Sequence, residues 1–494
     1  MKRYLAETLL FIKRMLGARK GRPAALVILL LLSLINLCSE WPRDVWRPAF
    51  VDAFEKLIPD SFGAPRELLF DHYQRRFPRI PTSEPVTIVE IDDKTLAATG
   101  QWPWPRNRLA ALVDAIAAMQ PVAIGLDIYM PEPDQTSPDK VADNLPPAEA
   151  ELAARLRKLP SHEAMLAKSL AAVPTILGAA AYDHAAFATS TDMRSVPVLV
   201  HGTDPLDKVQ RFDHVLASLP ELQAAAQGQA MLNVALEQGT VRRVPMVMAL
   251  GDKLVPSLSI EMLRVATGSP VLDVYADAYG VQSVGVADVR VPTQPDGDFW
   301  LHFASIRTTQ NRYVSARDVL QGHVSPERIH NKLVLIGLTG SGLTDMRTTV
   351  LNELVPGIEI QAQIIESIFE GRYLRRPAWL KWAECAFTLT FGLLMIWYVP
   401  RADSHLARFM RTVPKASAVV GVGLNLLILW SCMVLFRAFG LLVDAASIFI
   451  ILSAVMGSFF STALADGDAR HKTAPAPTAS DDHGRIGRTP ESPV

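Results

Sequence analysis

Cysteine is scarce in this sequence. The chain holds three cysteines, Cys38, Cys385 and Cys432, and each of them lies in an apolar run. Three cysteines cannot build the disulfide framework of a small secreted domain or a four-cysteine zinc site. The long polar middle of the chain contains no cysteine, so thiol chemistry is excluded there.

An excess of either charge is also absent. Lysine and arginine total 49 against 50 aspartate and glutamate residues, which gives a formal net charge of −1. A nucleic-acid-binding protein is expected to carry a basic excess, so we expect no nucleic-acid partner. Charged residues make up only 20% of the chain and apolar residues 49%. This composition is too apolar for a disordered protein and indicates segments that contact a lipid bilayer.

The motifs of common hydrolases are missing from the polar middle. It contains neither H-E-x-x-H nor G-x-S-x-G, so metalloprotease and serine-hydrolase mechanisms have no support. The stretch GLTGSGLT imitates a phosphate-binding loop but has Leu343 where the loop lysine is required. We therefore expect no enzyme and no cofactor. Backbone amides from Gly340 onward could still hold a small anion, although a tight turn is the simpler interpretation.

Four apolar runs predict transmembrane helices, at residues 23–39, 381–399, 416–436 and 441–464. Each run is close to the ~20 residues that cross a bilayer. Basic residues precede the first run and follow the second and the fourth, so the positive-inside rule places both termini in the cytoplasm. Residues 40–380 then lie outside the cytoplasm. A cleaved signal peptide is the alternative for the first run, but no A-x-A site follows it.

The segments that flank these runs are predicted to be cytoplasmic. They are the basic N-terminus (residues 1–22), the basic loop (residues 400–415) and the tail (residues 465–494). The tail is rich in proline, alanine, serine and threonine without apolar periodicity, which predicts disorder. It is too short to hold a kinase, cyclase or phosphodiesterase domain. Within the membrane, Asn425 could form a hydrogen bond between helices, and pairs of small residues favour a homodimer.

The outer domain is predicted to be α/β. Residues 86–92 and 122–128 are β-branched, apolar runs, and residues 106–119 between them have the apolar spacing of an amphipathic helix. Strand, helix and strand in this order form a βαβ crossover. A later apolar run at residues 332–338 repeats the strand pattern, and residues 357–370 repeat the helix pattern.

Antiparallel pieces are expected between these elements. Residues 230–234 and 245–250 flank one short loop, and residues 289–291 and 299–303 flank another. The predicted architecture is an α/β domain with a mostly parallel central sheet plus antiparallel strands. It is attached to four transmembrane α-helices, one N-terminal and three C-terminal.

Several stretches together resemble the CHASE-type-2 domain, the extracellular sensory module associated with bacterial cyclases and histidine kinases. They are IVEIDDKTLAATGQWPWPRNRLAALVDAI, VAIGLDIYMPEPD, LNVALEQGTVRRVPM, KLVLIGLTGSGLTDMRTT and VPGIEIQAQIIESIFEGRYL. The resemblance spans residues 85–374 and includes the order of the blocks. The three closely spaced C-terminal apolar runs are similar to the membrane unit that follows this domain in the family.

This resemblance implies a protein of the bacterial inner membrane. Its periplasmic domain would control an intracellular catalytic output. The sequence departs from the family in two ways. No cyclase or kinase domain follows the last apolar run, so we expect a separate signalling partner of that kind. Gln361 stands where a histidine is common in the PGIEI-x-A motif, so no role of that histidine is carried over.

Acidic side chains follow several of the predicted strands. The carboxyl ends of parallel strands meet at one edge of a sheet, where ligands of open α/β sheets bind. The candidate ligand residues of this edge are Asp92, Asp93, Asp127, Glu132, Asp134, Asp345 and Arg347. Such a cluster would suit magnesium or calcium, or a cationic ligand. The alternative is that Asp92 and Asp127 cap helices or hold loops through backbone hydrogen bonds.

Two further groups of residues are candidates for ligand contact. Trp102 and Trp104 could stack on a ligand, although we favour a role in sealing the core. Arg106 stands at a predicted helix start, where the helix dipole disfavours it, so we expect an acidic partner such as Asp127 or Glu132. Arg242 and Arg243 could contact an anion, with a solvated hairpin turn as the alternative.

These patterns predict a sensory inner-membrane protein. Its outer domain would bind an unknown periplasmic ligand and shift the packing of its membrane helices. The alternative is a structural or assembly subunit of the cell envelope that uses the outer domain for docking.

Overall fold

The computed structural model describes residues 22–39, 51, 63–186, 189–234, 237, 239–343, 345–398 and 416–458. The chain forms two compact units. A helical unit comprises Met1–Ile35, Ala386–Asn425 and Ile448–Val494, and an α/β unit comprises Asn36–Cys385 and Leu426–Ser447. Apart from Arg22, the predicted cytoplasmic N-terminus, basic loop and tail lie outside the described residues.

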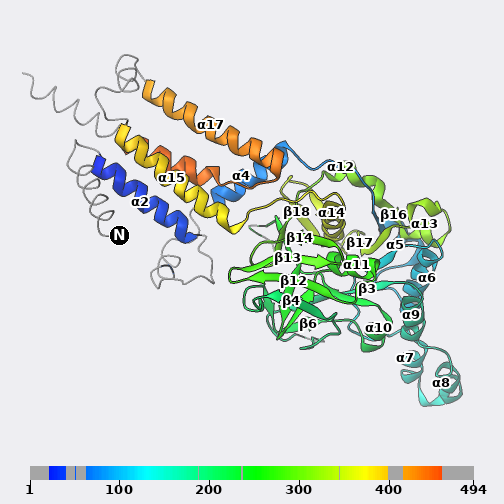
Figure 1. Cartoon of the computed structure of the whole chain (residues 1–494). Coiled ribbons are helices and arrows are strands. Elements are labelled where there is room, and N and C mark those ends of the chain that lie inside the picture. The colour runs from blue at the N-terminus through cyan, green and yellow to red at the C-terminus, as the bar shows by residue number, and fades with distance from the viewer. Residues whose placement is uncertain are drawn as a thin grey trace, which may run out of the picture. The chain divides into compact units, whose positions relative to one another are not determined.

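A parallel sheet forms the centre of the α/β unit (Figure 1). Its strands, in spatial order, are β16 (Tyr313–Ser315), β1 (Val86–Ile91), β17 (Leu333–Leu338), β2 (Ala123–Leu126), β3 (Thr175–Tyr182) and β7 (Gly228–Met231). A short strand, β6 (His214–Leu216), runs antiparallel to the end of β3. Ile88 of β1 lies opposite Leu335 of β17 on one side and Tyr313 of β16 on the other. The predicted mostly parallel sheet is therefore confirmed.

Helices cover both faces of this sheet. One face packs against α6 (Arg106–Ala117), α9 (His162–Ala171), α10 (Pro220–Ala225) and α13 (Ala316–Leu320). The other face packs against α11 (Leu258–Thr267) and α14 (Gly357–Phe369). Along β17, Leu333 and Leu335 join the α11–α14 core, whereas Val334 and Ile336 join the opposite core. The continuous apolar runs in the sequence reflect this burial on both faces.

Shorter helices and sheets surround this centre. The short helices are α5 (Asp93–Thr99), α7 (Pro138–Asp143), η1 (Pro147–Glu149), α8 (Ala150–Leu156), α12 (Ile306–Thr309), η2 (Gln310–Arg312) and η3 (Pro326–Arg328). One sheet has the order β14 (Val289–Pro292), β13 (Gly280–Val286), β12 (Leu272–Asp277) and β4 (Val198–Gly202). A second sheet contains β11 (Lys253–Pro256), β10 (Val247–Leu250) and β5 (Arg211–Phe212). A third is formed by β15 (Asp298–Trp300) and β9 (Arg243–Pro245). A fourth contains β19 (Leu354–Pro356), β18 (Met346–Thr349) and β8 (Thr240–Val241).

Both predicted antiparallel pairs were wrong. β7 lies in the parallel sheet beside β3, and β10 pairs with β11. β14 pairs with β13, and β15 pairs with β9. β10 and β14 form tighter local hairpins with β11 and β13, through the registers Leu250–Lys253 and Val286–Val289. β7, whose residues are all buried, lies instead in the parallel sheet.

Three of the described helices are long and apolar enough to cross a membrane. They are α2 (Arg22–Ser39), α15 (Ala378–Tyr398) and α17 (Ala416–Phe439). The fourth predicted span corresponds to a shorter apolar helix, Ala445–Ser458, and residues 459–464 lie outside the described part. This helix starts at Ala445 because Asp444 caps it, accepting a 2.9 Å hydrogen bond from the Ser447 N–H. In the helical unit, the Asn425 amide donates to the Ser453 hydroxyl at 3.3 Å, as expected for a bond between helices.

A helix that was not predicted, α4 (Gly63–Arg76), is held by a buried ion pair. Arg242 donates from Nε and Nη2 to the two carboxylate oxygens of Asp71, each at 2.9 Å. Both side chains are 3% exposed or less. Two parallel N–H···O bonds of this kind fix orientation as well as distance, so Arg242 has a structural role here.

We predict that Asp71→Asn destabilises the α/β unit strongly. The substitution removes the carboxylate that Arg242 binds at 2.9 Å and leaves only Glu67 at 3.9 Å and Glu237 at 4.0 Å near the buried guanidinium. Breaking a buried pair on one side costs about 3–5 kcal/mol. Thermal unfolding of the full chain in detergent measures the effect. The control is Asp213→Asn, because Asp213 faces Arg211 at 3.8 Å on the surface. Equal effects of the two substitutions would contradict the assignment.

Candidate ligand cavity at the carboxyl edge of the sheet

A cavity of about 250 Å³ opens at the carboxyl edge of the central sheet. Its walls come from the segments that follow β2, β7 and β17, from the loop before α6, and from the first turn of α14. The lining residues are Trp102, Asp127, Ile128, Tyr129, Leu232, Val234, Leu338, Leu343, Asp345, Arg347, Gly357, Ile358 and Gln361. The cavity thus lies where the strand order predicted a ligand site, and it includes four of the predicted residues: Trp102, Asp127, Asp345 and Arg347.

Asp127 follows β2 directly and lines this cavity. Its backbone N–H donates to Ile336 O at 2.9 Å, which fixes the residue at the strand end. Within the part of the chain that the structure describes, no hydrogen bond or ion pair reaches the carboxylate. Burial, with a smaller contribution from the Asp345 carboxylate, raises the pKa of Asp127 from 3.8 to about 7.

Gln361 is the second polar group of the cavity without a partner. It is 2% exposed, and its Oε1 accepts no hydrogen bond from the described residues. Gln363, two residues further along α14, is just as buried but bonds to the N–H and C=O of Ala304 and to Glu359. An unsatisfied buried polar group costs about 1–3 kcal/mol, so such a group in a cavity suggests a ligand contact.

The remaining polar groups lie at the rim of the cavity. Arg347 Nε donates to the Asp345 carboxylate at 3.0 Å, and Asp345 O accepts from Gly357 N at 2.9 Å. Tyr129 is 45% exposed, and burial raises the pKa of its phenol. No side chain caps α14. Tyr129 and Gln361 were not predicted as site residues. The sequence feature that could have identified Gln361 is the presence of a polar residue on the buried side of an apolar helix.

Two of the predicted carboxylates hold local structure and do not line the cavity. Asp92 caps α5, accepting from Thr95 N and from the Ser315 hydroxyl, both at 2.9 Å. Asp93 accepts from the Ser341 N–H at 2.7 Å and from its hydroxyl at 2.8 Å. These bonds lower the pKa of Asp93. The alternative interpretation, that strand-end carboxylates hold loops, therefore describes Asp92 and Asp93.

Asp134 caps α6 from outside the helix. Its carboxylate accepts from the Arg106 N–H at 2.7 Å and contacts His162 Nδ1 at 2.8 Å. The expected partner of Arg106 was Asp127 or Glu132. In the described residues the Arg106 guanidinium forms no ion pair, and Asp134 instead binds its backbone. Glu132 is exposed and lies outside the cavity lining.

The other predicted site residues form contacts outside the cavity. Trp104 is 2% exposed and donates from Nε1 to Gly100 O at 3.1 Å, as favoured for a core residue. Arg242 binds Asp71, as described above. Arg243 donates from Nε to Glu237 at 2.6 Å, and its guanidinium lies over the Trp300 ring. The Arg242 side chain is 3% exposed, and the Arg243 side chain is 27% exposed but paired with Glu237.

The glycine turn after β17 is not an anion cradle. Gly340 N donates to Ile91 O at 3.0 Å, and Ser341 N donates to Asp93. Two of the candidate amides are therefore already bonded. A Cβ at Gly340 would lie 2.6 Å from Leu96 Cδ1, so a larger residue would require the Leu96 side chain to shift. Nor do the described residues contain a group of three or more His, Cys, Asp or Glu side chains that could hold a metal ion.

A comparison with known protein families identifies the domain. The CHASE2 domain model matches residues 54–398, which is more than half of the chain. The chain belongs to the CHASE2 family. CHASE2 domains are sensory extracellular domains and are not catalytic, which fits a non-enzyme. The matched region includes the whole lining of the cavity. No curated protein and no solved structure matches the chain.

We predict that Asp127→Asn raises the thermal unfolding midpoint of the CHASE2 domain, and raises it more at pH 8 than at pH 5. Because folding raises the pKa of Asp127 from 3.8 to about 7, the native chain loses stability as pH rises through this window. Asparagine removes that loss. Thermal unfolding of the full chain in detergent at the two pH values is the measurement.

The control for this prediction is Asp93→Asn, which should show the opposite sign. Its pKa is lowered by the Ser341 hydrogen bonds, so its ionised form stabilises the fold, and this contribution disappears as pH falls. The Asp93→Asn variant should therefore lose more stability at pH 8 than at pH 3. A gain for Asp127→Asn that does not change between pH 5 and pH 8 would contradict the assignment.

Proposed function

We propose that this chain is an inner-membrane sensory protein with a periplasmic CHASE2 domain, and that the cavity at the carboxyl edge binds its signal. Family membership and the three apolar helices support a sensory membrane protein. The distribution of basic residues in the sequence supports a periplasmic domain and cytoplasmic termini. The unpartnered Asp127 and Gln361 side chains in the cavity are the observation that carries the assignment of the site.

The signal is proposed to travel along α14. The first turn of this helix, with Gly357, Ile358 and Gln361, lines the cavity. After α14 ends at Phe369, the chain enters α15 at Ala378. A ligand that binds one arrangement of this turn more tightly than another would shift the population of that arrangement, because differential affinity is the only source of such a shift.

A buried junction follows α14 and ties it to α15. Arg376 donates from both Nη atoms to the Glu384 carboxylate, at 2.9 and 3.0 Å. Arg376 also donates to Leu442 O at 2.7 Å, and Glu384 accepts from Asp444 N at 2.7 Å. The segment after α14, the start of α15 and the connection after α17 thus share one set of bonds. This junction is the proposed relay.

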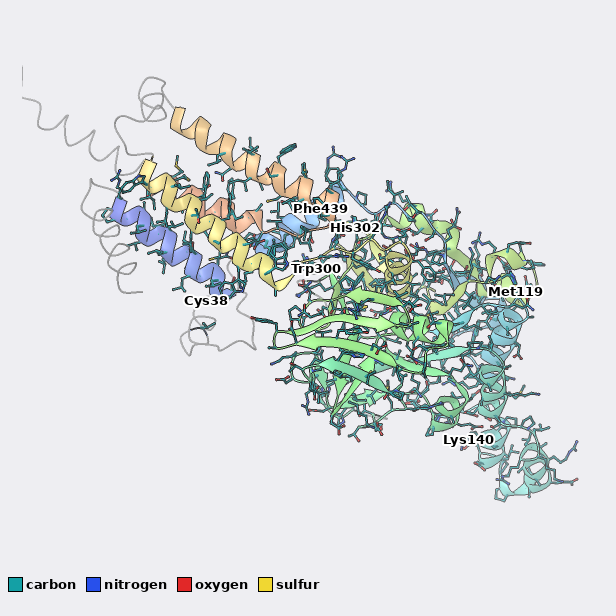
Figure 2. All side chains as sticks on the ribbon, viewed as in Figure 1. Cys38, Met119, Lys140, Trp300, His302 and Phe439 are labelled. Atoms are coloured by element: carbon teal, nitrogen blue, oxygen red, sulfur yellow. The ribbon has the colours of Figure 1, made fainter. Side chains whose placement is uncertain are left out.

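Aromatic contacts join the end of α17 to the rest of the α/β unit, in the region where Figure 2 labels Trp300, His302 and Phe439. The Tyr73 ring of α4 lies 5.4 Å from the Phe436 ring of α17, and the His302 ring lies 5.7 Å from it. Burial lowers the pKa of His302 to about 4, so its imidazole is neutral in this apolar setting. The end of α17 is therefore packed on the CHASE2 domain, which supports a mechanical connection.

Binding and relay can be separated by two variants. We predict that a small-molecule fraction from the periplasm protects backbone amides of α14 from hydrogen exchange in the full chain in nanodiscs. Gln361→Leu should remove this protection at the cavity. Glu384→Gln should keep it at the cavity but abolish any change in α15. The surface substitution Gln135→Leu is the control, and protection that persists in Gln361→Leu would contradict the site.

The output is proposed to lie in a separate cyclase or kinase. Purification of the intact protein from its native membrane should recover such a chain. Recovery of envelope-assembly components alone would instead favour the alternative, a structural docking subunit. A cavity that combines apolar walls with a few polar groups is the feature that favours sensing over docking.

A further inference from the structure

We propose that the cavity recognises a small organic cation of the ammonium type. Its charged head would contact Asp127, Gln361 and the two aromatic rings of the lining, and its apolar part would lie against the aliphatic side chains. This inference rests on the proposed function, because it names the class of ligand for the same site.

The charges of the cavity favour a cation. Its lining contains three formally charged side chains: Asp127, Asp345 and Arg347. Arg347 and Asp345 neutralise each other through a hydrogen bond of 3.0 Å. Asp127 is left without a counterion from the described residues, so a ligand with a positive charge would complete the site. An anion would face this carboxylate with no free cation in the lining to balance it.

The partial positive charge at the N-terminus of α14 does not reverse the preference of the cavity for a cation. A helix N-terminus carries about half an elementary positive charge. The Gly357 N–H of the first turn already donates to Asp345 O at 2.9 Å, so it is not open to an anion. The buried Gln361 amide adds an oxygen that can accept an N–H from an ammonium group or face its polarised C–H groups.

The walls indicate an organic cation and not a metal ion. Six of the thirteen lining residues are aliphatic: Ile128, Leu232, Val234, Leu338, Leu343 and Ile358. Such side chains cannot replace the oxygen ligands of magnesium or calcium, but they suit methyl and methylene groups. Trp102 and Tyr129 add aromatic surfaces, which attract ammonium groups through their π faces. The cavity volume of about 250 Å³ limits the ligand to a small molecule.

The test compares charged probes with a neutral one of the same shape. Calorimetry on the full chain in nanodiscs would measure binding of choline, ethanolamine and putrescine, and of 3,3-dimethylbutan-1-ol, the uncharged isostere of choline. We expect at least one cation to bind, and we expect the isostere to bind at least tenfold more weakly than choline if choline is that cation. Asp127→Asn should weaken cation binding at least tenfold, whereas Asp93→Asn, outside the cavity, should not change it.

The dependence on pH gives a second readout. Cation affinity should fall by up to about tenfold for each pH unit below 7, because only the ionised fraction of Asp127 is competent to bind. The charged or titratable groups around it in the lining are Tyr129 on the same segment, Asp345 just before β18 and Arg347 in β18. Choline itself does not titrate, so the profile reports these protein groups. The dependence should be much weaker in Asp127→Asn.

The results of these experiments test the class of ligand separately from the location of the binding site. If no cation binds, or if choline and its isostere bind equally, the inference of a cation is overturned. The proposed function would still stand if the periplasmic fraction protected α14 in a manner that depends on Gln361. If neither the cations nor the fraction bound, the site and the ligand class would both be rejected.

Discussion

A buried set of charges on α14 is the interaction on which the rest of the CHASE2 domain depends. Arg79 lies 3.0 Å from Glu366 and 3.1 Å from Glu370, and Arg312 lies 2.6 Å from Glu366. All of these side chains are 3% exposed or less. Removing one member would leave a buried charge without its partner, at a cost of about 3–5 kcal/mol. The position of α14 is therefore strongly constrained, and with it the position of every group that the helix carries.

This constraint connects the cavity with the membrane-proximal junction. Gln361 sits one turn into α14 at the cavity, and the chain beyond Phe369 leads to Arg376 and Glu384. Close packing helps to hold the helix in place, since a Cβ at Gly337 of β17 would lie only 2.4 Å from Ile358 Cδ1. A helix fixed by charges along its length and bonded beyond its end is suited to transmit a shift as a unit, because packed cores and ion pairs have discrete arrangements.

The sequence predicted much of the fold and part of the site. Apolar runs at β1, β2 and β17 identified the buried parallel strands, and the strand-end rule selected Asp127, Asp345 and Arg347. Trp102 was selected separately, as an aromatic side chain that could stack on a ligand. The same rule selected Asp92, which follows a strand equally well. It could not show that Thr95 and Ser315 already satisfy Asp92, because the Ser315 bond joins segments 223 positions apart in the chain. Gln361 was missed because burial without a partner is visible only when the neighbours are known.

Strand pairing was likewise only partly predictable from the sequence. The hairpins expected at residues 230–250 and 289–303 were wrong because β7 and β15 find distant partners that bury them better. Composition and periodicity determined on their own that this chain has an α/β domain between apolar helices, since burial on both faces of a strand leaves a direct mark in the residue types. Only the tertiary structure decided which carboxylates keep a free face in the cavity, since that depends on hydrogen-bond partners brought together from remote parts of the chain.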